Sequence, residues 1–181
     1  SDFDVPHSVS AGALLRAGPL TLTGLYRYRS GTPFTPGFRA GVDANGDGSP
    51  WNDVAFVDDT VTGVGALLAA WECLKVQAGR FAERNSCRDP GVHTLDVRLS
   101  LGPVRINQLE IALDAAGLNL VESDEAVRDH ALYLVDGGRS ISTDPLTGTV
   151  SVPLTVNPNF GQPLVRRSPG RMIRLGFRVT Y

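Results

Sequence analysis

The strongest constraint on the fold of this chain is an alternation of apolar and other residues that runs through several separate segments. The clearest case is RMIRLGFRVTY, residues 171–181, where every second position is apolar: Ile173, Leu175, Phe177, Val179 and Tyr181. A period of two over a stretch of this length predicts a β-strand with one apolar face. The pattern recurs in four further segments, namely 7–17, 20–30, 93–101 and 106–118. We therefore expect an all-β chain with about five antiparallel strands.

The connections between these segments alternate in length. Two are short and contain Gly-Pro, at 17–19 and 102–104, whereas the other two extend over 31–92 and 121–170. Loops of that length are uncommon inside a compact soluble domain. Short turns at one end of the strands and long loops at the other are typical of an up-and-down transmembrane β-barrel of the outer membrane. The pattern predicts a fragment of such a barrel, with two short periplasmic turns and two long extracellular loops.

The charged residues of the alternating segments fall on the side opposite the apolar stripe: Arg27, Arg29, Asp96, Arg98, Glu110, Asp114, Arg174 and Arg178. An arginine that faces lipid at mid-depth costs about 2–4 kcal/mol, and in a wet interior this cost is absent. A strand of about ten residues, at roughly 3.3 Å per residue and a tilt near 40–45°, rises about 25 Å, which matches the lipid-facing band of a barrel. We expect the apolar residues of 172–181 to face lipid, and Arg174 and Arg178 to face the interior.

Other classes of protein fit the sequence less well. A secreted calcium-dependent β-sandwich that binds carbohydrate is the main alternative, but it does not account for the alternation of short and long connections. The net charge of −2 and the lack of a basic stretch free of acidic residues disfavour a nucleic-acid-binding protein. The histidines are scattered at positions 7, 93 and 130, and no catalytic motif accompanies them. We expect no enzymatic activity.

Five motifs, in this order along the chain, resemble the last strands of TonB-dependent outer-membrane receptors: DFDVPHSVSAGALL, YRYRSGTPFTP, DANGDGSPWNDVAFVDD, GRFAERNSCRDPGVHTLDVRLS and NPNFGQP. The resemblance is greatest to the Oar-like type, whose precursors often carry a carboxypeptidase-regulatory-like domain. It covers nearly the whole chain and implies a barrel of about 22 strands, with an N-terminal plug and a segment that contacts TonB. Residues 1–181 then correspond to the C-terminal part of the barrel, without the plug and the earlier strands.

The resemblance also implies a function and a location. Receptors of this family take up nutrients across the outer membrane of Gram-negative bacteria in an energised step. The implied partners are outer-membrane lipid, the barrel assembly machinery, TonB through the missing N-terminal part, and an unknown ligand. The alternation that ends at Tyr181 resembles the C-terminal signal recognised by the assembly machinery, and Tyr181 is expected in the periplasmic aromatic girdle.

One stretch, DANGDGSPWNDVAFVDD, has oxygen-bearing side chains at the spacing that opens a calcium-binding loop. Asp43, Asn45 and Asp47 stand at alternate positions, and glycines between them allow a tight loop. The glutamate that closes an EF-hand is missing, so Asp53 or Asp58 would complete a site of different geometry. A loop of Asx turns with solvated carboxylates is the alternative. Ca²⁺ is the one cofactor suggested, and both interpretations remain open.

The two cysteines, Cys73 and Cys87, lie within the first long loop. In the predicted topology this loop passes through an oxidising compartment, where such a pair is expected to form a disulfide. Closing a loop of about 15 residues contributes about 3 kcal/mol in the chain-entropy model. A zinc site would need two further ligands, and His93 is the only histidine close by. The composition of residues 65–85 predicts a short helix on this loop.

Overall fold

The computed structural model describes residues 4–39, 43, 47–49, 52–121, 125–135, 142–143, 145–147, 150–151, 153–167 and 170–181. The chain divides into two compact units, which we describe separately. We call residues 5–31, 90–127 and 165–181 the sheet unit, and residues 1–4, 32–89 and 128–164 the loop unit. The fold is mostly β with antiparallel sheets, as predicted.

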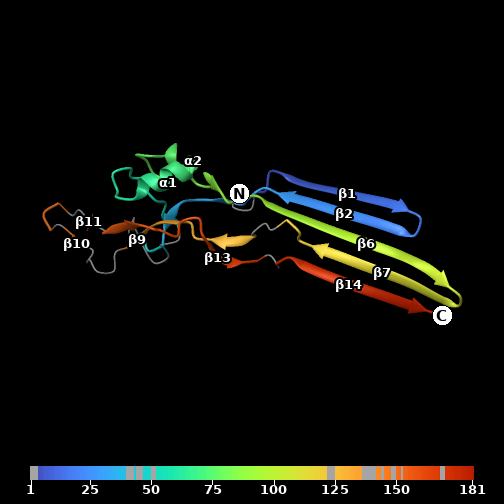
Figure 1. The fold of residues 1–181 in the computed structure, drawn as a ribbon. Helices are drawn as coiled ribbons and strands as arrows, with labels where there is room; N and C mark the ends of the chain where they lie inside the picture. The colour runs from blue at the N-terminus through green and yellow to red at the C-terminus, as the bar shows by residue number, and fades with distance from the viewer. Residues whose placement is uncertain are drawn as a thin grey trace. The chain divides into compact units, whose positions relative to one another are not determined.

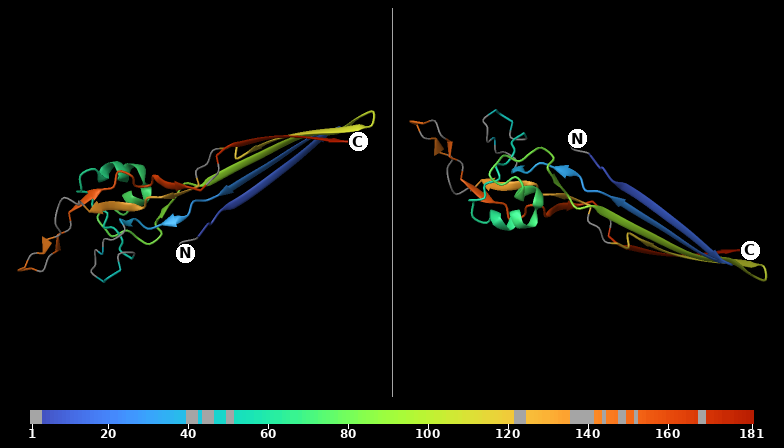
Figure 2. Two further views of the ribbon diagram at one scale, coloured as in Figure 1. Left: turned by 90° about the horizontal axis from the view of Figure 1, so that it is seen from below. Right: turned by 90° about the horizontal axis from the view of Figure 1, so that it is seen from above.

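The sheet unit consists of one five-stranded antiparallel sheet with the strand order β1-β2-β6-β7-β14 (Figure 1). Its strands are β1 (Ser8–Ala17), β2 (Leu20–Arg29), β6 (Val92–Ile106), β7 (Leu109–Leu118) and β14 (Met172–Thr180). Each of the five alternating segments therefore forms a strand, and Tyr181 follows the last one. Figure 2 shows the same strands side by side from two further directions. The sheet is not closed into a barrel, because β1 and β14 are its edges.

Of the two predicted Gly-Pro turns, the first is confirmed and the second is wrong. Gly18, with φ 57°, and Pro19 connect β1 to β2. Gly102-Pro103 instead lies inside β6, and the chain reverses at Asn107 and Gln108. Asn107 has φ 56°, a left-handed conformation that asparagine tolerates better than most residues. A Gly-Pro pair also occurs at β-bulges, and Gly102-Pro103 forms one, so the motif alone did not identify a turn.

The lengths of the connections follow the predicted alternation. The β1–β2 turn, the β6–β7 turn and the C-terminus lie at one end of the sheet (Figure 1). The two long connections, from β2 to β6 and from β7 to β14, leave from the opposite end. One end of the sheet is therefore built from tight turns, and both long connections start and finish at the other end.

The long connections contain short elements. The first holds β3 (Pro33–Phe34), β4 (Gly37–Phe38), α1 (Val64–Ala70), α2 (Glu72–Lys75) and β5 (Cys87–Arg88). The second holds β8 (Ala126–Arg128), β9 (Ala131–Val135), β10 (Ser142–Thr143), β11 (Val150–Ser151), β12 (Leu154–Val156) and β13 (Pro163–Arg166). Strands from both connections combine in the three-stranded sheet β12-β9-β4, whereas the pair β3-β5 forms within the first connection. The predicted helix is present as the short helices α1 and α2, and among the described residues no helix is long and apolar enough to cross a membrane.

The loop unit contains the hydrophobic core. Every buried apolar side chain in the described part of the chain belongs to this unit, and the largest include Phe34, Leu74, Leu132, Tyr133 and Phe160. Trp71, between the two helices, packs edge-on against Phe160 and Phe34 at centroid distances of 5.2 and 5.7 Å. In the sheet unit, by contrast, no residue of the five strands is buried. The two units therefore differ in how they are stabilised.

Candidate functional site

The five-stranded sheet has a continuous apolar face. Residues directly opposite each other on antiparallel strands share a face, and the register aligns two complete rows: Ala17, Leu20, Leu101, Leu113 and Phe177, then Leu15, Leu22, Leu99, Ala115 and Leu175. On the last strand these side chains are among the most exposed apolar groups of the protein, with Leu175 at 78% and Phe177 at 80%. The predicted alternation of β14 is therefore observed, and Ile173 and Val179 lie on this same face.

A bulge in β6 extends this face toward the tight turns. Leu101 is paired with Leu113 and Val104 with Ile111, so Gly102 and Pro103 together oppose one residue of β7. The additional residue shifts the alternation of β6 by one position. Val104 consequently joins the apolar row of Ile111 and Val179.

The opposite face, which we call the polar face, carries ion pairs between strands. Arg27 lies 3.6 Å from Asp96, and Arg98 lies 3.7 Å from Asp114. Arg105 and Glu110, which face each other across the β6–β7 turn, are 2.7 Å apart. The prediction that the charged residues lie opposite the apolar stripe is confirmed by this register. The charged side chains of the five strands therefore all lie on the polar face.

Aromatic side chains gather on the apolar face at the end away from the tight turns. The Tyr26 hydroxyl and Nδ1 of His93 share a hydrogen bond of 2.7 Å. The rings of Tyr28 and His93, which are directly opposite in the register, have centroids 4.8 Å apart. Sequence reasoning did not single out His93, although it continues the alternation of Leu95 and Val97. Amphipathic rings of this kind suit a boundary between an apolar and an aqueous region.

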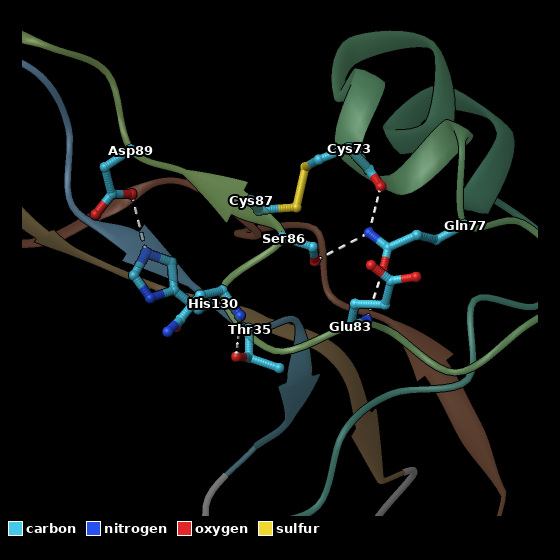
Figure 3. Close-up of a disulfide and its surroundings, with 9 residues drawn as sticks. Thr35, Cys73, Gln77, Glu83, Ser86, Cys87, Asp89 and His130 are labelled. Carbon is cyan, nitrogen blue, oxygen red and sulfur yellow. Dashed lines mark hydrogen bonds and ion pairs between the residues drawn. A yellow bond between two sulfur atoms is a disulfide. The ribbon is translucent and has the colours of Figure 1, made fainter. Parts of the chain in front are cut away.

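The predicted disulfide between Cys73 and Cys87 is present, with a Cα–Cα distance of 5.3 Å (Figure 3). It joins α2 to β5. Gln77, buried beside it, was not recognised in the sequence: its Nε2 donates to the Cys73 carbonyl and to Ser86 Oγ, and its Oε1 accepts from the Glu83 N–H. The disulfide and this amide together fix the segment between the helices and β5.

A histidine and a carboxylate are paired near the disulfide (Figure 3). Nε2 of His130 lies 2.9 Å from Oδ1 of Asp89, and the Asp89 side chain also accepts from the Thr32 hydroxyl at 3.3 Å. An ionised carboxylate can only accept, so Nε2 carries the proton of this bond. The ring also stacks parallel to that of Phe34, with centroids 3.8 Å apart and planes inclined by 4°. The imidazole is thus held in one orientation.

Two titratable groups of the loop unit have shifted pKa values. Tyr133 is 1% exposed, and burial raises its pKa above the ordinary value while its hydroxyl accepts a hydrogen bond from the Asp58 N–H at 3.1 Å. Asp58 is half-buried. Hydrogen bonds from the hydroxyl and the backbone N–H of Thr60 lower the pKa of Asp58.

A groove with a volume of about 800 Å³ lies within the loop unit. Its wall includes Arg39, whose Nη2 is 3.4 Å from Oδ2 of the buried Asp129, and Arg128, whose Nη1 donates to the Gly161 carbonyl at 2.9 Å. His130 and the exposed Leu164 also line it. Asp129 is further held by the Ala131 N–H, which donates to Oδ1 at 3.1 Å. Sequence reasoning did not identify this groove, because its residues come from distant parts of the chain.

The residues of the calcium hypothesis are only partly described, since Asn45 lies outside the described residues. Asp43 accepts a hydrogen bond from the Gly48 N–H at 2.8 Å, and Asp47 accepts from the Ser49 N–H at 2.8 Å and from Asn52 at 2.7 Å. The Asp47–Ser49 contact, from a carboxylate to the backbone N–H two residues on, is that of an Asx turn, and the other two contacts join residues five positions apart. Within the described ranges, no group of three or more histidine, cysteine or acidic side chains has the arrangement of a metal site. Calcium binding by Asp43, Asn45, Asp47 and Asp53 stays a prediction.

Comparison of the chain with models of protein families, with curated protein sequences and with solved structures gives no match.

Proposed function

We propose that this chain forms part of the wall and loops of an outer-membrane β-barrel, as the C-terminal segment of a TonB-dependent receptor of the Oar-like type. The observation that carries this proposal is the five-stranded sheet with an exposed apolar face and an ion-paired polar face. The receptor would take up a nutrient ligand in an energised step. Transport requires the plug and the TonB contact that the resemblance implies for other parts of the receptor.

The proposal explains why a large apolar face can stay uncovered by protein without a cost in free energy. Soluble monomers rarely expose contiguous apolar patches larger than a few hundred Å², whereas this face extends over all five strands. In contact with lipid its exposure costs nothing, and the polar face lines a wet interior. The ten residues of β2, Leu20–Arg29, cover about 33 Å along the strand at roughly 3.3 Å per residue, and they rise about 24 Å at a tilt near 40–45°. A tilted strand of this length fits the apolar band of a barrel, with Tyr26, Tyr28 and His93 at one interface and Tyr181 at the other.

The open edges favour a larger assembly. In a bilayer the unpaired N–H and C=O groups along β1 and β14 need partners, because lipid offers none. We infer that further strands of the same receptor pair with both edges and close the barrel. In this topology the tight turns are periplasmic, and the two long connections with the disulfide are extracellular. Ile173, Leu175, Phe177, Val179 and Tyr181 would carry the signal for the assembly machinery.

The soluble calcium-dependent β-sandwich receives less support. A sandwich covers the apolar face of each sheet with a second sheet, whereas Ile173, Leu175 and Phe177 are all more than three-quarters exposed, at 77%, 78% and 80%. The two functions differ in a simple property of the purified chain. A sandwich stays in solution without detergent, and a barrel segment precipitates unless detergent covers its apolar face.

A matched pair of substitutions tests the proposal. Val179, on the apolar face of β14, and Val76, at the end of α2 in the loop unit, are exposed to similar extents, 53% and 58%. In the full-length receptor, Val179→Asp is expected to lower the amount in the outer membrane several-fold, and Val76→Asp to leave it unchanged. Equal amounts of the two variants would contradict a lipid-facing role for this side of the sheet.

A further inference from the structure

The groove of the loop unit has the composition of a site for a small anionic ligand. We propose that it binds a small carboxylate that has an apolar body, with the carboxylate held by Arg128 and Arg39 and the body placed against His130 and Leu164. Its volume of about 800 Å³ lies within the range of small-molecule sites, about 300–1,000 Å³. The inference concerns the loop unit alone and stands whether or not the sheet lies in a membrane.

The charges around the groove favour an anion. Three arginines and two aspartates line it, the third arginine being Arg84 and the second aspartate Asp53. The carboxylate of Asp129 is already matched by Arg39 and by the Ala131 N–H. Arg128 makes no ion pair within the described part of the chain, so the positive charge that it contributes is not neutralised at short range.

Arg128 also has the geometry for carboxylate recognition. A guanidinium has five N–H donors in a planar fork, and a carboxylate can accept two of them at once. One donor on Nη1 binds the Gly161 carbonyl at 2.9 Å, which orients the side chain. Arg39 uses Nη2 for its 3.4 Å contact with Asp129. Each arginine therefore keeps N–H groups for a ligand while a protein contact holds its position.

The apolar part of the groove is rigid. His130 is fixed between the stack on Phe34 and the hydrogen bond to Asp89, and Phe34 itself is 5% exposed. Leu164, in contrast, is 57% exposed, so more than half of its apolar surface is in contact with water. A ligand with a carboxylate alone would leave this surface in water, which is why the proposal includes an apolar body.

Titration of the full, oxidised chain in detergent, followed by ligand-observed NMR, tests the inference with N-acetylphenylalanine as the probe. This probe is expected to bind at least tenfold more tightly than N-acetylphenylalaninamide, which has the same body without the charge. Glucuronate, a carboxylate on a polar body, is expected to bind at least tenfold more weakly than the probe. These two comparisons separate a peptide-like carboxylate from an acidic sugar.

Arg128→Gln is expected to weaken binding of N-acetylphenylalanine at least tenfold, and Arg128→Lys, which keeps the charge without the fork, to weaken it less. Arg80→Gln is the matched control, because Arg80 also lies in the loop unit and donates to a backbone carbonyl, that of Val76 at 2.7 Å. The proposal would be overturned by equal affinity for the acid and the amide, or by the lack of saturable binding at millimolar probe. It would also be overturned if Arg128→Gln and Arg80→Gln lost the same affinity for N-acetylphenylalanine. Tighter binding of glucuronate than of N-acetylphenylalanine would contradict the proposal that the ligand has an apolar body.

Discussion

Leu101 and Val104 are three residues apart in β6, yet their side chains lie on the same face of the sheet. Leu101 is opposite Leu113 and Val104 is opposite Ile111, and these two partners are two residues apart on β7. The bulge at Gly102-Pro103 accommodates the additional residue of β6, because both of its residues oppose a single residue of β7. Without it, Val104 and Ile106 would lie on the polar face and Arg105 on the apolar face. The bulge therefore maintains the separation of apolar from charged residues up to the tight turns.

Gly102→Ala is expected to destabilise the sheet by about 1–3 kcal/mol. Gly102 has φ +104°, and an added Cβ would lie 2.5 Å from the Ile111 carbonyl oxygen. Gly24→Ala is the matched control in the same sheet, because no atom lies within 4 Å of an added Cβ there, and its effect should stay within about 0.5 kcal/mol. Denaturant unfolding of both variants in detergent gives the comparison. Equal stability of the two would show that the bulge tolerates a side chain.

Replacing both cysteines by serine is expected to lower the free energy of unfolding of the loop unit by about 3 kcal/mol. The reason is the entropy of the unfolded segment between Cys73 and Cys87, which are separated by 14 positions. Limited proteolysis and denaturant unfolding measure the effect. A reducing agent should reproduce it in the unsubstituted protein and have no effect on the double variant. Alkylation of both thiols in the folded, unreduced protein would disprove the bridge.

The stability of the loop unit is expected to fall at high pH because of Tyr133. Burial raises the pKa of this phenol in the folded state, so the stabilisation is fully present below the unfolded value of about 10 and is lost as the pH rises through the folded pKa. Tyr133→Phe should be less stable at neutral pH, since the Asp58 N–H loses its acceptor, but should show a weaker decline above pH 10 or so. Parallel unfolding curves from neutral to alkaline pH test this. If both proteins lost the same stability as the pH rises, groups other than Tyr133 would be responsible for the decline.

The strands of the sheet were predictable because their signal is local. A period of two is visible within ten residues, and the faces follow directly from it, as in Leu175 and Arg174. The second turn was missed because Gly-Pro is compatible with both a turn and a bulge, and only the cross-strand register distinguishes them. The loop unit was not predictable, because its contacts join distant residues: Tyr133 to Asp58, and His130 to Asp89. Cys73 and Cys87 are the exception, since a chain with two cysteines leaves one possible partner for each.

Phe177 and Arg178 provide a direct comparison of the two faces of β14. Phe177 is opposite Leu113 on the apolar face, and Arg178 is opposite Ala112 on the polar face. On the proposed function, Phe177→Asp in the full-length protein is expected to lower outer-membrane levels sharply, because a carboxylate would have to enter lipid. Arg178→Gln should have a much smaller effect, since its side chain would remain in the wet interior of the proposed barrel. Immunoblots of outer-membrane fractions measure both, and normal insertion of Phe177→Asp would refute the assignment of this face.

The most direct measurement of the central claim is the environment of each side chain along β14 in a bilayer. Single cysteines are introduced by Arg174→Cys, Leu175→Cys, Phe177→Cys and Arg178→Cys, and labelled with a nitroxide while Cys73 and Cys87 remain bridged. In the reconstituted full-length protein, the labels at 175 and 177 should collide mainly with dissolved oxygen, which concentrates in lipid. The labels at 174 and 178 should collide mainly with a water-soluble nickel complex. Equal accessibility at all four positions, or the reverse alternation, would contradict the account of this sheet as the wall of a membrane barrel.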